Sequence, residues 1–206
     1  MTEPRKEESG ARPSSGRAFL SDTKKPLRCT PLWRGIAVPS LKAQLIFWPL
    51  MVLGLALDLW SKWAVFNWLE QKPGNSVSII DGFLRLVMAL NDGAAFGLFS
   101  GKPYLLVAVS IVALIAIFAI FLFSGTERRF VHIALALFAA GVCGNLYDRI
   151  FNDGLVRDFI DVVYWPGRHW PAFNIADSML CIAVGLLVIS TFFTGKSFQK
   201  CGQQHK

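Results

Sequence analysis

Charged residues and paired cysteines are both scarce in this chain of 206 residues. Asp, Glu, Lys and Arg make up 17% of it, and hydrophobic residues make up 53%. Soluble domains carry about 25% charged and about 45–50% apolar residues. Because the apolar excess is gathered in long blocks, it indicates a membrane protein rather than a soluble one. The four cysteines form no C-x-x-C pair, which argues against a disulfide framework or a cysteine-based metal site.

Motifs of the common hydrolytic sites are missing as well. The chain contains no H-E-x-x-H zinc motif and no G-x-S-x-G nucleophile elbow. Metal-based and covalent hydrolysis therefore have little support, and we expect neither a metal ion nor another cofactor.

Four apolar segments are long enough to cross a bilayer, and backbone groups in lipid must be satisfied within each segment, so all four should be helices. They are Leu45–Phe66, Tyr104–Phe123, Phe130–Leu146 and Ile175–Phe193. The predicted fold class is a membrane all-α protein with four transmembrane helices and a small extracytoplasmic β-sheet.

The N-terminal segment differs from the rest of the chain. Residues 1–43 hold nine Lys or Arg, four acidic residues and five of the ten prolines. This composition predicts a disordered, basic cytoplasmic tail near anionic lipid, and no contact with nucleic acid. The transmembrane domain is expected over residues 44–195, with a short cytoplasmic tail at 196–206.

Lys and Arg counts give an orientation. If the N-terminus is cytoplasmic, fourteen of the 21 basic residues lie on the inner side and seven in or near the outer half. This asymmetry favours cytoplasmic positions for both termini. With four spans, Asp58, Asp148, Asp158 and Asp177 then converge on the outer face of the membrane.

The longer outer connection, residues 67–102, contains two β-prone runs around Asp81-Gly82. This pattern predicts a small hairpin or sheet. The glycines and alanines of NDGAAFG, residues 91–97, either allow close backbone approach or form a flexible entry into the second helix.

The shorter outer connection, residues 147–174, ends at Asn174, a natural N-cap for the fourth helix. Asp177 lies in the first turn, deeper than a cap, although simple capping remains an alternative for both residues. Asp153 and Asp161 are interpreted as solvated loop charges.

Two carboxylates that meet share a proton, so one can act as a base while the other polarises a carbonyl group. A second group of charges favours a structural interpretation. Asp58 and Lys62 are spaced i, i+4, and Asp148 and Arg149 are adjacent. These four residues are expected to hold the outer helix ends together through ion pairs.

Four motifs follow one another along the chain: LDLWSKW at 57–63, NDGAAFG at 91–97, GNLYDRIFNDGLVRDFIDV at 144–162 and FNIADS at 173–178. Together they resemble the lipoprotein signal peptidase family, also called signal peptidase II. The resemblance implies an intramembrane aspartic endopeptidase of the bacterial cytoplasmic (inner) membrane. Such an enzyme removes the signal peptide from diacylglyceryl-modified prolipoproteins, cutting before the lipidated cysteine. The implied partners are this substrate and membrane lipid, and we expect a monomer.

Carried over by motif, Asp158 and Asp177 correspond to the family's catalytic pair. The remaining motif residues surround the site: Asp58, Lys62, Asn91, Asn145, Asp148, Arg149 and Asn174. A segment that closes over substrate would fall in Asn152–Trp170 or near Leu84–Leu90. The substrate helix would pack against small residues of the third span, namely Ala139, Ala140, Gly141 and Gly144.

The chain departs from the family pattern at three points. Ser61 replaces a common Thr, and the connection from Arg149 to Asp158 is one residue longer than usual. Arg157 stands beside Asp158, where an apolar residue is common, and is expected to lower the pKa of that carboxyl group.

Two other functions fit parts of the sequence. Intramembrane Asp and Arg residues are also typical of a small proton-coupled transporter, but no internal repeat is present and the polar groups gather near one face. A structural membrane scaffold leaves Asp158 and Asp177 unexplained.

Overall fold

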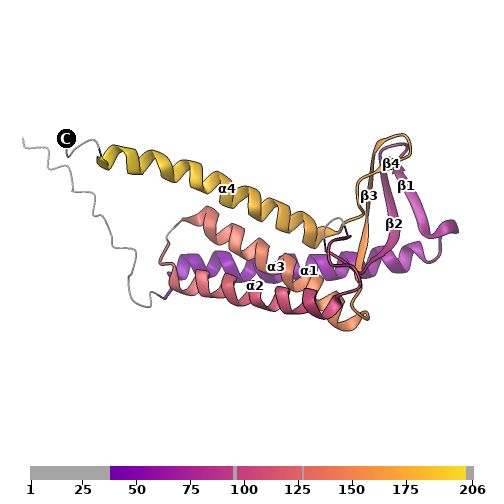
Figure 1. Ribbon diagram of the computed structural model, residues 1–206, viewed down its shortest axis with the longest axis horizontal. Helices are drawn as coiled ribbons and strands as arrows, with labels where there is room; N and C mark the ends of the chain where they lie inside the picture. Colours follow the sequence, from indigo (N-terminus) through magenta and orange to yellow (C-terminus); the bar gives the residue numbers. More distant parts are fainter. Residues whose placement is uncertain (1–37, 95–96, 127, 203–206) are drawn as a thin grey trace, which may run out of the picture. The chain divides into compact units, whose positions relative to one another are not determined.

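The computed structural model describes residues 38–94, 97–126 and 128–202, all within one compact unit, Arg34–Lys206 (Figure 1). Most of the tail predicted to be disordered therefore lies outside the described residues. Within these ranges the chain forms four long helices, α1 (Leu41–Leu69), α2 (Pro103–Phe123), α3 (Arg129–Phe151) and α4 (Ile175–Gly202). Each contains one of the four predicted spans.

Three of these helices, α1, α2 and α3, are long and apolar enough to cross a membrane. In α4 the apolar part found among the described residues is shorter, Ile175–Thr191. The exposed side chains of α1 and α2 include many large apolar ones, such as Val52, Leu53, Val112 and Ile115. A broad apolar surface is unfavourable in water but stable against lipid chains, so it supports a multi-pass membrane protein.

Helix α3 packs against each of the other three helices. Toward α1 and α2 it contributes Leu135 and Ala139 to a cluster in which Phe47 stacks on Phe121 with ring centroids 3.9 Å apart. Its small residues are buried within these contacts. A Cβ atom on Gly141 would lie 2.7 Å from the carbonyl oxygen of Ala176.

The expected use of these small residues by a substrate helix is therefore wrong. Ala139, Ala140, Gly141 and Gly144 are all buried, and a Cβ atom on Gly144 would collide with Asp58. These residues instead let α1 and α4 approach α3 closely, because their missing side chains leave room for a neighbouring helix.

A four-stranded antiparallel sheet, in the order β1-β2-β3-β4, completes the fold. Its strands are β1 (Ser76–Ile80), β2 (Leu84–Asn91), β3 (Val156–Trp165) and β4 (Arg168–His169), and a 3-10 turn, η1 (Pro73–Asn75), precedes them. The predicted hairpin around Asp81-Gly82 is confirmed, with Gly82 at a φ of 73°. Strand β3 was not predicted; its Asp158 lies opposite Ala89 of β2.

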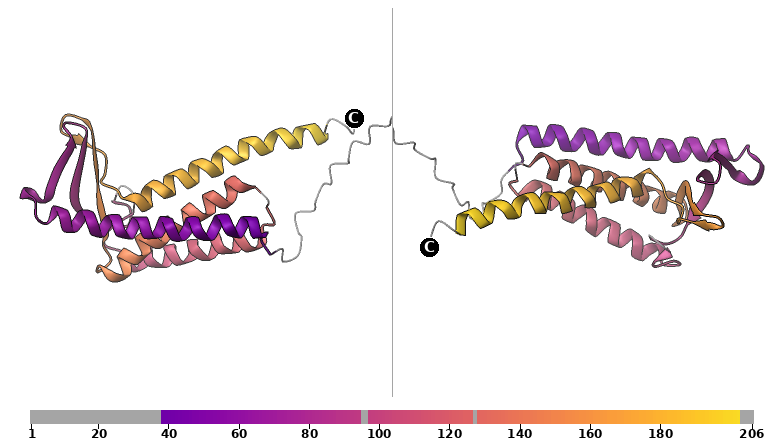
Figure 2. Two further views of the ribbon diagram at one scale, coloured as in Figure 1. Left: turned by 180° about the vertical axis from the view of Figure 1, so that it is seen from behind. Right: turned by 90° about the horizontal axis from the view of Figure 1, so that it is seen from above.

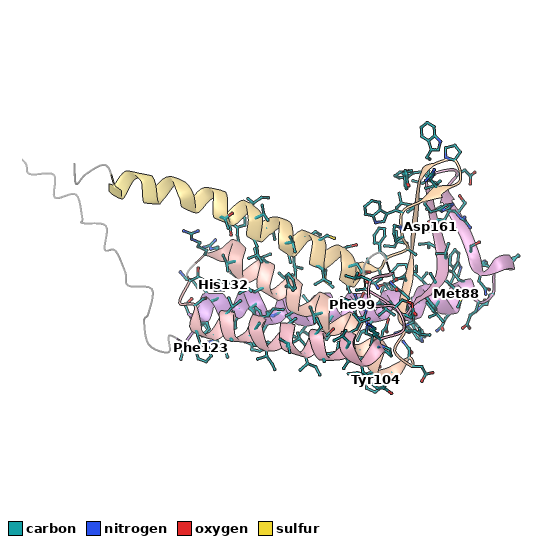
Figure 3. The ribbon with its side chains drawn as sticks, viewed as in Figure 1. Met88, Phe99, Tyr104, Phe123, His132 and Asp161 are labelled. Atoms are coloured by element: carbon teal, nitrogen blue, oxygen red, sulfur yellow. The ribbon has the colours of Figure 1, made fainter. Side chains whose placement is uncertain are left out.

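The sheet lies at the end of the helices where α1 ends and α4 begins (Figure 2). Strands β2 and β3 both contact α1. Figure 3 shows Met88 and Asp161 in the sheet, whereas Phe123 and His132 lie at the opposite ends of their helices. The course of the chain through the four helices and the sheet thus brings the motif residues of α1, α3, β3 and α4 to one end.

Candidate active site

Asn174 and Asp177 form a reciprocal cap at the start of α4. The backbone N–H of Asp177 donates to Asn174 Oδ1 at 3.0 Å, and the backbone N–H of Asn174 donates to Asp177 Oδ2 at 3.1 Å. This is the geometry of a capping box. The predicted N-cap is confirmed, and Asp177 lies in the first turn as predicted and also takes part in the cap, the alternative that the sequence left open. The cap holds one carboxylate oxygen of Asp177 in place and leaves Oδ1 available for other contacts.

The side-chain amide of Asn174 reaches from α4 to β3. Its Nδ2 donates to Asp158 Oδ1 at 2.7 Å, to Asn145 Oδ1 at 3.1 Å and to the carbonyl oxygen of Arg157 at 3.3 Å. Asn174 is fully buried and Asp158 is 1% exposed. One asparagine therefore contacts both aspartates that the sequence analysis selected, Asp158 and Asp177.

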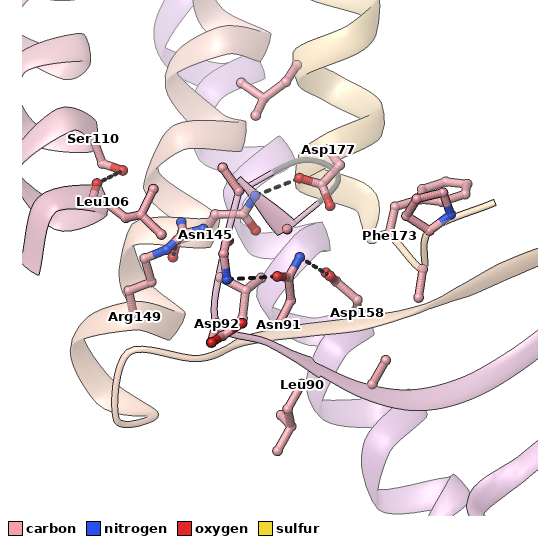
Figure 4. A pocket seen from close by; sticks show the side chains of 18 of the residues that line it. Leu90, Asn91, Asp92, Leu106, Ser110, Asn145, Arg149, Asp158, Phe173 and Asp177 are labelled. Atoms are coloured by element: carbon pink, nitrogen blue, oxygen red, sulfur yellow. Dashed lines mark hydrogen bonds between the residues drawn. The ribbon is translucent and has the colours of Figure 1, made fainter. Parts of the chain in front are cut away.

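Two further asparagines donate to the remaining oxygens of the pair, Oδ2 of Asp158 and Oδ1 of Asp177 (Figure 4). Asn91 Nδ2 donates to Asp158 Oδ2 at 3.0 Å, while Asn91 Oδ1 accepts from the backbone N–H of Gly93 at 2.9 Å. Asn145 Nδ2 donates to Asp177 Oδ1 at 2.8 Å. Because every carboxylate oxygen of the pair accepts a hydrogen bond from a fixed donor, both groups are held in defined orientations.

The environment of Asp158 favours its protonated form. Burial, followed by the nearby charge of Asp177, raises the pKa of Asp158 to about 7, although hydrogen bonds from Asn91 and Asn174 and the charge of Lys62 oppose the shift. Arg157 is not among the groups that act directly on this pKa, as its position beside Asp158 had suggested, because its side chain binds Asp148 instead. Asp158 therefore keeps its proton to a higher pH than an ordinary aspartic acid does.

Below the pair, Lys62 is completely buried. Its Nζ lies 2.8 Å from Asp58 Oδ2 and 3.3 Å from Asp148 Oδ2, and it donates to Asn145 Oδ1 at 3.0 Å. Asp58 Oδ1 in turn accepts from the backbone N–H of Ala176 at 2.8 Å. The predicted Asp58–Lys62 pair is present, and this network joins α1, α3 and α4 beneath the two aspartates.

Arg149 does not join that network. Its Nη2 donates to the carbonyl oxygen of Gly93 at 2.9 Å, and its Nη1 donates to the carbonyl oxygen of Asn145 at 3.4 Å. The Nε atom is buried and has no hydrogen-bond partner among the described residues. The expectation that all four of these charges form ion pairs is therefore wrong for Arg149, whose contacts among the described residues are to backbone carbonyl oxygens.

A cavity of about 750 Å³ lies over the pair. Its polar part contains Asp158, Asp177, Asn145 and Arg149 (Figure 4). The rest of its wall is largely apolar and comes from β2, α2, α4 and the segment before α4, with Leu90, Leu106, Val109, Phe173 and Leu180 among the lining residues. Such a cavity can take a mostly apolar segment and place one polar bond against the carboxyl groups.

Sequence reasoning missed several contacts near the site. Asp161 is 7% exposed rather than solvated, and its Oδ1 lies 2.9 Å from His169 Nδ1. Arg85 lies 3.8 Å from its other oxygen. Asp153 is exposed, as expected. Within the described part of the chain, no group of three or more His, Cys, Asp or Glu side chains is placed to hold a metal ion.

The comparisons with known proteins agree with the motifs. The family model for signal peptidase (SPase) II matches residues 50–193. The chain belongs to the signal peptidase II family. The matched region contains both aspartates of the pair and the seven polar residues around them.

Individual relatives are named as lipoprotein signal peptidases. The chain is 38% identical over 175 residues to a "Lipoprotein signal peptidase" of Rhodopirellula baltica, covering 77% of this chain and 76% of that protein. It is 37% identical over 147 residues to one of Geobacter metallireducens, covering 70% and 88%.

Solved structures of membrane enzymes share the fold. One, described as "Bacterial membrane enzyme structure by the in meso method at 2.3 A resolution", is 30% identical with a TM-score of 0.67 and covers 80% of this chain and 96% of that one. A second, at 1.9 Å, is 32% identical with a TM-score of 0.62 and covers 77% and 97%.

Proposed function

We propose that this chain removes signal peptides from diacylglyceryl-modified prolipoproteins, cutting before the lipidated cysteine, with Asp158 and Asp177 as the catalytic pair. The function is that of its family, and the relatives are named for it. The assignment of the pair rests on one observation: Asn174 hydrogen-bonds to both aspartates at the polar end of a single cavity.

The chemistry follows from the unequal environments of the two carboxyl groups. Protonated Asp158 donates a hydrogen bond to the oxygen of the scissile carbonyl and polarises it. A water molecule between the two groups gives a proton to the carboxylate of Asp177 as its oxygen bonds to the carbonyl carbon. In the same step Asp158 transfers its proton to the former carbonyl oxygen, and the product is a neutral tetrahedral diol. Asp177 then transfers its proton to the amide nitrogen, the C–N bond breaks, and one hydroxyl of the diol returns its proton to Asp158, which restores the starting state of the pair.

Arg149 is proposed as a substrate-binding residue. It is a half-buried cation that lines the cavity, and its Nε–H points to no acceptor among the described residues. A peptide carbonyl oxygen of the substrate is a suitable acceptor for this donor. Asp58, Lys62 and Asp148 are proposed to support the pair from below, whereas Asn91, Asn145 and Asn174 orient it.

The proposed topology has four spans, both termini in the cytoplasm and the site near the outer face of the bacterial cytoplasmic membrane. The distribution of Lys and Arg, fourteen against seven, supports this orientation. The proposed peptidase domain is residues 44–195. The elements that form the cavity pack together within a single copy of the chain, so a monomer in contact with membrane lipid is sufficient for the proposed reaction.

The direct test uses purified protein in detergent with a diacylglyceryl-modified prolipoprotein, and cleavage is followed by the shortened product. Asp158→Asn and Asp177→Asn should each abolish cleavage. Asp153→Asn is a matched control, because Asp153 is exposed and has a positive φ of 52° that Asn tolerates. Cleavage by the two dyad variants at the wild-type rate would refute the assignment, and solute flux in liposomes without cleavage would favour a transporter.

A further inference from the structure

Arg157 holds a buried carboxylate with three donors. Its backbone N–H donates to Asp148 Oδ2 at 3.0 Å, while Nη2 and Nε donate to Oδ1 at 2.6 Å and 3.2 Å. Asp148 is fully buried, whereas the Arg157 side chain is 19% exposed. Charge-assisted contacts of this kind are among the stronger hydrogen bonds in proteins. They fix the beginning of β3 against the last turns of α3.

Two paths of hydrogen bonds lead from this contact to the catalytic pair. The first starts at Asp148, which lies 3.3 Å from Lys62 Nζ; Lys62 donates to Asn145, and Asn145 donates to Asp177. The second is shorter. The carbonyl oxygen of Arg157 accepts from Asn174 Nδ2, and the same nitrogen donates to Asp158 Oδ1.

We propose that Arg157 is a positioning residue for the catalytic pair, acting through Asp148 to set the place of β3 and to balance the charge beneath the two aspartates. This inference rests on the proposed function of the pair. Successive side chains of a strand point to opposite faces, so Arg157 does not share the face of Asp158. Its effect on the reaction is therefore indirect.

The charges around the pair define the electrostatic part of the proposal. Helix α1 contributes Asp58 and Lys62, and α3 contributes Asp148 and Arg149; with Arg157 these five side chains carry a net charge of +1. A pair of aspartates that shares one proton carries −1, so the buried group as a whole is neutral.

Among the described residues that line the cavity, one further charged group is on the segment after β2. Asp92 is exposed and accepts from Ser100 Oγ and from the backbone N–H of Gly101. Solvent screens it more strongly than the buried charges. Loss of the Arg157 cation therefore leaves an uncompensated negative charge beside the pair, and this charge favours protonation of the pair.

The test compares Arg157→Gln and Arg157→Lys by measuring kcat, KM and the pH dependence of kcat/KM. Arg157→Gln should lower kcat by about tenfold, since small displacements of catalytic groups have effects of this size or larger. KM should change by less than about threefold, because the residue touches no substrate. Both limbs of the pH profile should move upward by about half a unit, as expected for a single neighbouring charge at a partly screened distance.

Arg157→Lys separates charge from geometry. An ammonium group keeps the charge but cannot reproduce the planar guanidinium contact. This variant should therefore return the pH limbs to their wild-type positions while kcat recovers only in part. Arg168→Gln is the matched control, because Arg168 is an exposed arginine of the same sheet, and it should behave as wild type in all three measurements.

Wild-type kcat and unshifted pH limbs in Arg157→Gln would overturn the proposal. So would a loss of activity that matches the loss of folded protein in thermal unfolding while the pH limbs stay in place. If Arg157→Gln does not fold, Arg157→Lys decides, and an unchanged kcat there counts against the geometric part. Failure of the proposed function gives a different result, because the Asp158→Asn variant would then still cleave the prolipoprotein.

Discussion

Replacement of Asn174 tests the arrangement of the pair most directly. Asn174 is fully buried, caps α4 and donates to three acceptors on α3 and β3. Asn174→Ala removes the cap and all of these donors. Asn174→Ser keeps a good N-cap, but its side chain is too short to reach Asp158.

The magnitudes follow from these contacts. Loss of an N-cap costs about 1 kcal/mol. Loss of the donor to the buried carboxyl group of Asp158 costs about 1–3 kcal/mol more. Asn174→Ala should therefore reduce the free energy of unfolding by about 2–4 kcal/mol, and Asn174→Ser by about 1 kcal/mol less than that. Because both variants free the carboxyl group of Asp158, both should lose about a hundredfold in kcat.

Thermal unfolding in detergent measures the stability, and cleavage of a lipid-modified prolipoprotein measures kcat. The important variant is Asn174→Ser, since its α4 remains capped. If it cleaves at the wild-type rate, Asn174 acts only as a cap and the bridging contact to Asp158 has no catalytic role. Equal stability of the Ala and Ser variants would contradict the capping argument.

Three further results are expected. Lys62→Met leaves the buried Asp58 without its cation, although Asp148 keeps Arg157, and should cost about 3–5 kcal/mol in thermal unfolding. The exposed Lys102→Met should change stability by less than about 0.5 kcal/mol, and similar values for the two variants would contradict the buried network. Gly141→Ala should destabilise the protein, because its Cβ atom would lie 2.7 Å from a backbone oxygen. Gly185→Ala should be neutral or stabilising by up to about 1 kcal/mol, because its Cβ atom would meet nothing within 4 Å. The opposite order of the two stabilities would contradict the described packing of α3. Since the pKa of Asp158 is raised to about 7, the folded state binds a proton that the unfolded state releases, and the stability should fall as pH rises from about 4 to about 7. Asp158→Asn should flatten this slope. An unchanged slope in that variant would assign the pH dependence to another group.

The hairpin and the helices were predictable because their signals are local. Long apolar blocks specify helices in lipid, and Asp81-Gly82 specifies a turn between β-prone runs. Strand β3 gave no comparable signal. Three charged residues interrupt it, namely Arg157, Asp158 and Asp161, and each is accommodated by partners on other elements.

The sequence also did not show which charged residues pair with one another. Asp148 and Arg149 are adjacent, yet successive residues of a helix point in different directions. Asp148 therefore pairs with Lys62 and Arg157, while Arg149 donates to backbone carbonyl groups near the cavity.

By itself, the sequence determined the membrane class of the protein and its family, and it pointed to the two aspartates that we propose as the catalytic pair, because hydrophobic blocks and motif letters are properties of the linear chain. The tertiary structure alone decided which of the two aspartates is desolvated and which donor each oxygen receives. Burial and hydrogen bonding depend on the pairing of β2 with β3 and on the packing of α3 against α1 and α4. These contacts join residues that lie far apart in the chain, so no local pattern encodes them.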